Sequence, residues 1–276
     1  MIARTWSRRV TLATSDADVF QALRYLECDP EIDGKDPEPL SISVEPHRSY
    51  YRVVQQGEIL REQMTPQAVC ETLHAELMLL SLADFPNVPL IHAASLRRDG
   101  RRILLVGPKG SGKTMLTLYL IRAGYEIEGD ENVFVTPEGV LARPRGLRVK
   151  QSAAAFLPHL SGALSGAPYY QDATGLRIYN LNPRLAGASF WRLERGKVDA
   201  VVLIRPNHGG YSSLRPVPSL ALVREVMEEC ALPEAERAAA IGAIVKAIGG
   251  AKGFDLSLGD LESAVACIDQ ASQELA

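Results

Sequence analysis

Residues 107–114 read Gly-Pro-Lys-Gly-Ser-Gly-Lys-Thr and match the pattern G-x-x-x-x-G-K-[ST]. Glycines let backbone N–H groups curl around phosphate oxygens. Lys113 can reach the β- and γ-phosphates of a nucleotide, and the Thr114 hydroxyl can bind Mg²⁺. The pattern predicts a P-loop that binds a nucleoside triphosphate with Mg²⁺. ATP is the expected nucleotide, although the pattern itself does not distinguish ATP from GTP. The predicted cofactor-binding residues are Gly107, Pro108, Lys109, Gly110, Ser111, Gly112, Lys113, Thr114 and Met115.

The flanking segments suit this interpretation. Ile103–Val106 is a short, fully apolar run that is typical of a buried strand. Met115–Ala123 is apolar almost all round, which indicates a buried helix. A helix that opens at the loop adds N–H groups and a dipole that favour an anion. The alternative, a purely structural glycine-rich turn, would not need Lys113 directly after Gly112.

An acidic corner follows the predicted P-loop helix. Many P-loop proteins carry an aspartate at the end of a later apolar strand, but the best such strand here, Val198–Ile204, ends in Arg205-Pro206. Asp130 and Glu131 instead follow one short strand after the helix, and adjacent strands would bring them near the phosphates. One acid can then deprotonate an acceptor hydroxyl while the other helps to hold Mg²⁺. The alternative is a solvated acidic turn.

Four landmarks in this order resemble the HPr serine kinase/phosphorylase family, and more closely its HPr-kinase-like serine kinases, including kinases of lasso-peptide precursors. They are His92 within Ile-His-Ala-Ala, the P-loop, the stretch from Ala123-Gly124-Tyr125 to Asp-Glu-Asn-Val at 130–133, and Arg145-Gly146-Leu147. The resemblance covers about residues 90–150. It implies a fold related to phosphoenolpyruvate carboxykinase.

The resemblance also implies roles for individual residues. Asp130 corresponds to the base that takes the acceptor proton, Thr114, Glu131 and Asp130 would serve the metal, and His92 would lie near the transferred phosphate. A lone strand histidine is more often structural, so that alternative stays open. The catalytic set predicted in this way is Asp130, His92 and Lys113.

This chain departs from the family pattern at three positions. Glu131 stands where the family has a second aspartate, Arg143 stands where the bifunctional enzymes have a glutamate, and Arg148 replaces a glycine. These changes speak against the reverse phosphorylase reaction and against HPr as the acceptor. The surrounding basic cluster is either an exposed charged face or a contact for phosphate or an acidic substrate. Arg145 and Lys150 are its candidate substrate-binding residues.

The remaining sequence indicates how these residues are held. Short alternating strands around 41–60 and a helix opened by Thr65-Pro66 predict a small α+β N-terminal module over 1–88. An α/β P-loop kinase core, related to HPr kinase, is predicted over 89–276. Residues 150–195 are rich in Gly and Pro and predict loops that could cover a site. Val198–Ile204 predicts a buried strand, and 219–230, 233–248 and 261–272 predict helices.

Composition bounds the partners. The formal net charge is −3, which gives no sign of a nucleic acid or a membrane as partner. The four widely spaced cysteines favour a reduced, cytoplasmic location, and no apolar run has the length of a membrane span. A homo-oligomer is left open.

These observations together predict an ATP- and Mg²⁺-dependent kinase that phosphorylates a hydroxyl, with serine of a peptide or protein as the expected acceptor. A small-molecule acceptor stays open within this class. Two other classes also stay open: a P-loop ATPase that acts as a switch or assembly factor, and a non-catalytic nucleotide-binding module.

Overall fold

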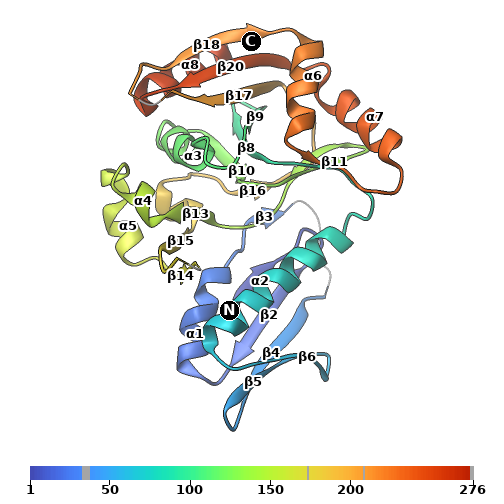
Figure 1. The fold of residues 1–276 in the computed structure, drawn as a ribbon, viewed down its shortest axis with the longest axis vertical. Coiled ribbons are helices and arrows are strands. Elements are labelled where there is room, and N and C mark those ends of the chain that lie inside the picture. The colour runs from blue at the N-terminus through green and yellow to red at the C-terminus, as the bar shows by residue number, and fades with distance from the viewer. Residues whose placement is uncertain (33–37, 173, 208, 274–276) are drawn as a thin grey trace. The chain divides into compact units, whose positions relative to one another are not determined.

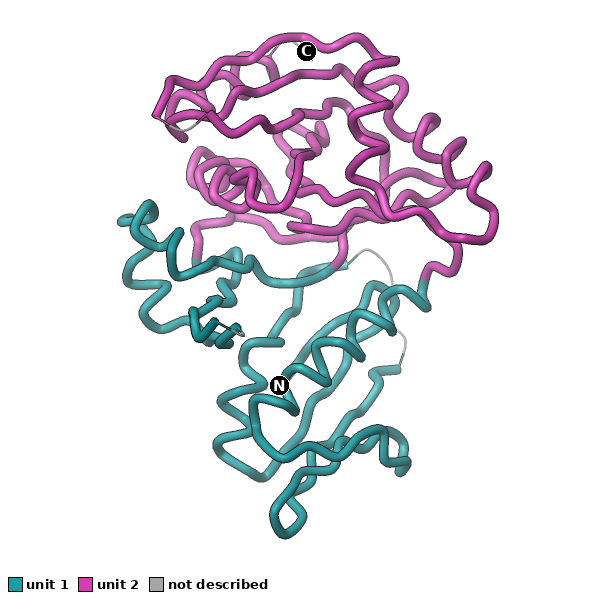
Figure 2. The backbone as a smooth tube through the Cα atoms, in the orientation of Figure 1, with its two compact units in different colours: residues 1–84, 144–185 teal, residues 85–143, 186–276 magenta. Residues whose placement is uncertain are grey.

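The computed structural model describes residues 1–32, 38–172, 174–207 and 209–273 as a mixed α/β protein (Figure 1). Its contacts divide the chain into two compact units, 1–84 with 144–185 and 85–143 with 186–276 (Figure 2). The expected division into 1–88 and 89–276 assigns 144–185 to the second part, whereas the contacts group this segment with the first. The physical reason is a set of hydrogen bonds from the segment to the N-terminal residues, such as Asn180 Nδ2 to the Tyr25 carbonyl at 2.7 Å.

The first unit contains a five-stranded sheet with the order β1-β2-β4-β5-β6. Helices cover its core, which is built from alternate strand residues such as Ile42 and Val44 together with Val19, Leu23 and Leu73. The strands are β1 (Ile2–Arg4), β2 (Arg9–Thr14), β4 (Leu40–His47), β5 (Tyr50–Gln55) and β6 (Glu58–Gln63), and the helices are α1 (Ala17–Leu23), η1 (Arg24–Leu26) and α2 (Pro66–Ala83).

Local sequence signals explain these elements. Gln56 and Gly57 both have positive φ, +51° and +84°, and turn β5 into the antiparallel β6, as expected for a hairpin at this point. Thr65 caps α2 by accepting a hydrogen bond from the Ala68 amide at 3.1 Å, and Pro66 follows as the first helical residue. The predicted start of this helix is confirmed.

The second part of the first unit corrects the prediction of irregular loops over 150–195. Alternation in 147–150 and 177–181 was hidden by nearby Gly and Pro residues, yet it builds a small antiparallel sheet of order β13-β15-β14. The elements in this region are β13 (Leu147–Lys150), α4 (Gln151–Ala154), η2 (Pro158–Leu160), α5 (Ser161–Ser165), β14 (Tyr169–Gln171), β15 (Arg177–Leu181) and η3 (Pro183–Ala186). Two further short strands elsewhere in the chain are β3 (Glu31–Ile32) and β16 (Arg192–Leu193).

The second unit is built on a six-stranded sheet of order β10-β8-β9-β17-β20-β18, in which β9, β17 and β20 run parallel. Its strands are β8 (Ala93–Arg98), β9 (Arg101–Val106), β10 (Glu126–Gly129), β17 (Ala200–Pro206), β18 (Ser213–Val217) and β20 (Lys252–Leu258). A four-stranded sheet of order β12-β11-β7-β19 accompanies it, made of β7 (Leu90–Ile91), β11 (Val133–Thr136), β12 (Gly139–Ala142) and β19 (Cys230–Ala231).

Alternate residues of β9 enter two different cores. Ile103 and Leu105 pack with Leu116 and Leu120 of α3 (Lys113–Arg122) and with α8 (Leu261–Gln273). Leu104 and Val106 pack in the opposite core, which contains α6 (Ser219–Glu228), α7 (Arg237–Ile248) and residues of the four-stranded sheet. Helices therefore bury both faces of the parallel strands, which is the arrangement of an α/β layer fold. The predicted strand and helices of this half are confirmed.

Across the described ranges, no helix is both long enough and apolar enough to span a bilayer.

Candidate functional site

The glycine-rich loop, residues 107–112, connects the end of β9 to the start of α3. A Cβ on Gly107 would lie 2.9 Å from the Ile204 carbonyl oxygen of β17, and a Cβ on Gly112 would lie 2.8 Å from Leu258 Cδ2 of β20. The loop therefore passes over the carboxyl ends of three neighbouring parallel strands, where open α/β sheets bind their ligands.

The backbone of the loop is shaped by two glycines with left-handed conformations. Gly110 and Gly112 have φ values of +87° and +98°, which L-residues with a side chain adopt only at a cost. Gly112 is also the N-cap of α3 and has no side chain with which to cap the helix. The first amides of α3 have no acceptor within the helix. This geometry suits an anion at the helix N-terminus.

Two polar side chains, one in the loop and one at the start of α3, are suited to bind a polar ligand. Ser111 Oγ is buried and has no hydrogen-bond partner among the described residues, although buried hydroxyls are normally satisfied. Lys113 Nζ donates to the carbonyl oxygens of Gly107 and of Pro108, the latter at 3.0 Å. Burial lowers the pKa of Lys113, while the charges of Asp130 and Glu229 raise it.

Asp130 lies directly after β10 and is buried. Its Oδ2 accepts a hydrogen bond from Thr114 Oγ1 at 2.6 Å. The structure thus brings together Thr114 and Asp130, two of the three residues that were expected to serve the metal. The expected reason was wrong, however, because β10 does not neighbour β9: β8 lies between them.

The backbone on either side of Asp130 has two unusual features. A Cβ on Gly129 would lie 2.9 Å from Ala142 Cβ and 3.0 Å from the Arg143 carbonyl oxygen, so only glycine permits this close approach. Glu131 then has a φ of +86°, which is rare for a residue with a side chain and recurs at functional sites. Its role as a magnesium ligand stays a prediction.

A buried ion pair anchors the strand that carries Asp130. Glu128, two residues before Asp130, accepts hydrogen bonds from Arg102 Nε and Nη2, both at 2.6 Å, and from Ser95 Oγ at 2.5 Å. Both partners of the ion pair are almost fully buried, with 4% and 3% of their side chains exposed. This bidentate pair ties β10 to β8 and β9 and so fixes where the acidic corner begins.

His92 lies between β7 and β8, close to the same charges. Its backbone N–H donates to the Glu229 carbonyl at 2.8 Å, and its Nδ1 lies 3.5 Å from Glu229 Oε2. Burial and the charge of Lys113 lower the pKa of His92, while Glu229 and Asp130 raise it. Glu229 was missed in the sequence, where it is one of several acids at the end of α6 and carries no motif.

The two substrate candidates belong to a different unit. Arg145 and Lys150 lie within 144–185, in the first unit, whereas the glycine-rich loop lies in the second. The basic cluster around them is not one exposed face, because Arg143 is buried and the Arg148 guanidinium stacks 3.7 Å from the Tyr25 ring centroid. A substrate role for Arg145 and Lys150 stays a prediction.

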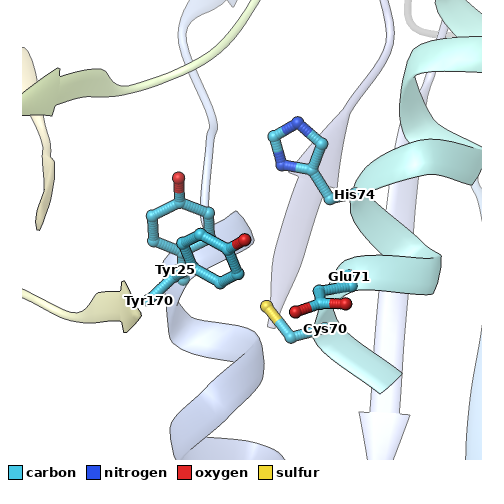
Figure 3. Close-up of a pocket in the computed structure, with 5 residues that line it drawn as sticks. All are labelled: Tyr25, Cys70, Glu71, His74 and Tyr170. Atoms are coloured by element: carbon cyan, nitrogen blue, oxygen red, sulfur yellow. The ribbon is translucent and has the colours of Figure 1, made fainter. Parts of the chain in front are cut away.

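The first unit has a pocket of about 350 Å³, lined by Tyr25, Cys70, Glu71, His74 and Tyr170 (Figure 3). The rings of Tyr170 and His74 lie 5.5 and 6.2 Å from that of Tyr25. Burial raises the pKa of Cys70 to about 12, so the thiol is neutral at physiological pH and is not an activated nucleophile. The lining combines two phenols, a thiol, an imidazole and a carboxylate, a mixture that selects no ligand class.

The donor set can be compared with the requirements of a metal and a nucleotide. The described ranges hold no group of three or more His, Cys, Asp and Glu side chains that could bind a metal by themselves. Mg²⁺ in phosphoryl-transfer sites is usually held by one or two protein oxygens together with substrate phosphates and waters. The Thr114–Asp130 pair fits that requirement. The buried Ser111 hydroxyl, which has no hydrogen-bond partner among the described residues, could donate a hydrogen bond to a phosphate oxygen.

Comparisons with known proteins give a distant structural likeness. No protein-family model matches the chain, and no curated protein matches it. Among solved structures, the chain is similar to the HPr(Ser) kinase/phosphatase from Coxiella burnetii, with a TM-score of 0.34 and 13% sequence identity over 67% of this chain and 97% of that one. At this level the likeness is distant.

Proposed function

We propose that the protein is an ATP- and Mg²⁺-dependent kinase that transfers the γ-phosphoryl group to a hydroxyl, with serine of a peptide or protein as the acceptor. The observation that carries the proposal is the hydrogen bond of 2.6 Å between Thr114 and Asp130. It joins the last residue of a phosphate-binding pattern to a buried acid, so that phosphate and acid would meet in one place. The choice of serine rests on the order of motifs over residues 90–150.

Each residue has a role in binding. The amides of the glycine-rich loop and Lys113 would hold the triphosphate, and the Ser111 hydroxyl would bond a phosphate oxygen. Thr114 and Asp130 would hold Mg²⁺, with Glu131 nearby in the sequence. Bound Mg²⁺ neutralises charge that develops on the transferred phosphoryl group.

Asp130 would also orient the acceptor hydroxyl and accept its proton. Most of the rate enhancement in such reactions comes from positioning and charge neutralisation rather than from covalent chemistry. A buried acid beside Thr114 would meet both needs, because it would lie close to the attacking oxygen and is shielded from bulk water.

The test is incubation of the protein with γ-labelled ATP, Mg²⁺ and a library of serine-containing peptides, followed by mass spectrometry. A phosphorylated peptide is the expected result. Released phosphate that increases with a partner protein, with no phosphorylated acceptor, would instead indicate an ATPase switch. Tight nucleotide binding without any turnover would indicate a non-catalytic binding module.

A further inference from the structure

The pair His92–Glu229 is held by two contacts at once. The backbone contact of 2.8 Å fixes the main chain of His92 against Glu229, and the side-chain contact of 3.5 Å places the carboxylate at Nδ1 of the ring. Glu229 itself is fixed, because its amide caps the end of α6 on the carbonyls of Val226 and Met227. The two side chains are 29% and 20% exposed, so the contact is partly shielded from water.

The charges around the imidazole explain which form of the ring this contact selects. The groups that act on it are Lys113 of α3, Asp130 after β10 and Glu229 after α6. Burial is the largest influence and lowers the pKa of His92, so the ring is neutral at neutral pH. A neutral imidazole has a single N–H, and an ionised carboxylate can only accept. A carboxylate at Nδ1 therefore favours the proton on Nδ1 and leaves Nε2 as an acceptor.

We infer that Glu229 is a positioning residue that holds His92 in the Nδ1–H tautomer, so that Nε2 is left as a hydrogen-bond acceptor rather than a donor. This inference rests on the proposed function for its role in transfer, but not for its geometry. It differs from a phosphate-facing role for His92, in which the ring would donate to an anion. A ring that accepts at Nε2 repels phosphate oxygens and can bond only a hydrogen-bond donor, while the proton of the attacking hydroxyl goes to Asp130.

The geometric part is tested by nitrogen NMR of the protein labelled with ¹⁵N-histidine. The signal of His92 is assigned as the one lost in His92→Gln. We expect the shifts of the Nδ1–H tautomer at neutral pH in the wild type. Glu229→Gln should weaken this preference and lower the pKa of His92 further, because the carboxylate charge that raised it is gone. Glu228→Gln, an exposed neighbour on the same helix, should leave the signal unchanged.

The functional part is tested by the rate of phosphoryl transfer. Glu229→Gln should lower kcat, measured at saturating ATP, by about tenfold or more. The acid limb of the kcat profile should move to lower pH together with the pKa of His92. Glu228→Gln should match the wild type in both respects.

The outcomes separate the two proposals. An Nε2–H tautomer in the wild type, or a Glu229→Gln spectrum no different from that of Glu228→Gln, overturns the inference. A kcat that survives Glu229→Gln overturns it as well. Absence of any phosphoryl transfer by the wild type would instead contradict the proposed function, while the NMR result would still decide the tautomer.

Discussion

Thr114 Oγ1 donates a hydrogen bond to Asp130 Oδ2 at 2.6 Å, although sixteen positions separate the two residues. One residue opens the helix after the glycine-rich loop, and the other follows a strand at the edge of the sheet. A hydroxyl and a carboxylate at this distance form the small oxygen set that Mg²⁺ accepts when phosphates and waters complete its shell.

The Thr114 hydroxyl should therefore contribute to Mg-ATP affinity. Thr114→Val keeps the shape and removes the hydroxyl, and we expect the affinity for ATP with Mg²⁺ to fall about tenfold or more. Thr114→Ser should largely retain it. The matched control is Thr117→Val, because Thr117 Oγ1 is buried on the same helix with no partner in the described parts of the chain. Calorimetric titration with and without Mg²⁺ measures the effect, and equal losses in the two valine variants would contradict it.

The conformation of Gly112 predicts a stability difference between glycines. An alanine at Gly112 faces both a φ of +98° and an overlap with Leu258, whereas an alanine at Gly110 faces only a φ of +87°. The left-handed conformation alone costs about 1–2 kcal/mol. We expect Gly112→Ala to lower the free energy of unfolding in urea by more than Gly110→Ala does. Gly250→Ala, with open space and no positive φ, should be neutral, and a ranking in which Gly112→Ala is the mildest would refute the argument.

The buried pair Arg102–Glu128 predicts a large loss of stability. Glu128→Ala would leave the Arg102 charge buried without its bidentate partner, which typically costs about 3–5 kcal/mol. The control is Glu262→Ala, which breaks the exposed pair Arg122–Glu262, with side chains 54% and 72% exposed, and should cost less than about 1 kcal/mol. Urea unfolding of both variants measures the difference, and similar losses would show that the buried pair has no special weight.

The sequence predicted the elements whose residues repeat at a clear period. The apolar run at 103–106, the helix after the glycine-rich loop and the capped helix at Thr65 all depend on neighbouring residues, and the structure contains each of them. The acidic corner was also expected near the loop, and Asp130 does contact Thr114.

Features that depend on contacts between distant residues could not be predicted from local sequence patterns. The position of β8 between β10 and β9 follows from strand pairing across the sheet, which no local pattern encodes. The grouping of 144–185 with the N-terminal residues depends on contacts such as Asn180 with Tyr25. Glu229 meets His92 only because β19 pairs with β7. The sequence around Glu229 shows an ordinary helix end.

Lys113 should be essential for nucleotide affinity. Its ammonium already donates to two loop carbonyls, and phosphate oxygens bound there would give it anionic acceptors in place of neutral ones. Lys113→Ala should weaken ATP binding by about 10–100-fold, which corresponds to one lost charged hydrogen bond. Lys246→Ala, on the exposed side of α7, is the charge-matched control. Fluorescence titration with a labelled nucleotide gives both affinities, and equal affinities would remove Lys113 from the site.

Parallel assays of Asp130→Asn test whether a bound nucleotide and Asp130 act in one place. ATP binding and phosphoryl transfer to a peptide acceptor are measured for wild type, Asp130→Asn and Glu126→Gln, the last an exposed acid on the same strand. We expect Asp130→Asn to bind ATP within a few-fold of the wild-type affinity but to transfer the phosphoryl group at least about 100-fold more slowly. Glu126→Gln should bind ATP and transfer the phosphoryl group as the wild type does. Phosphoryl transfer at the wild-type rate in Asp130→Asn would show that Asp130 does not act on the bound nucleotide.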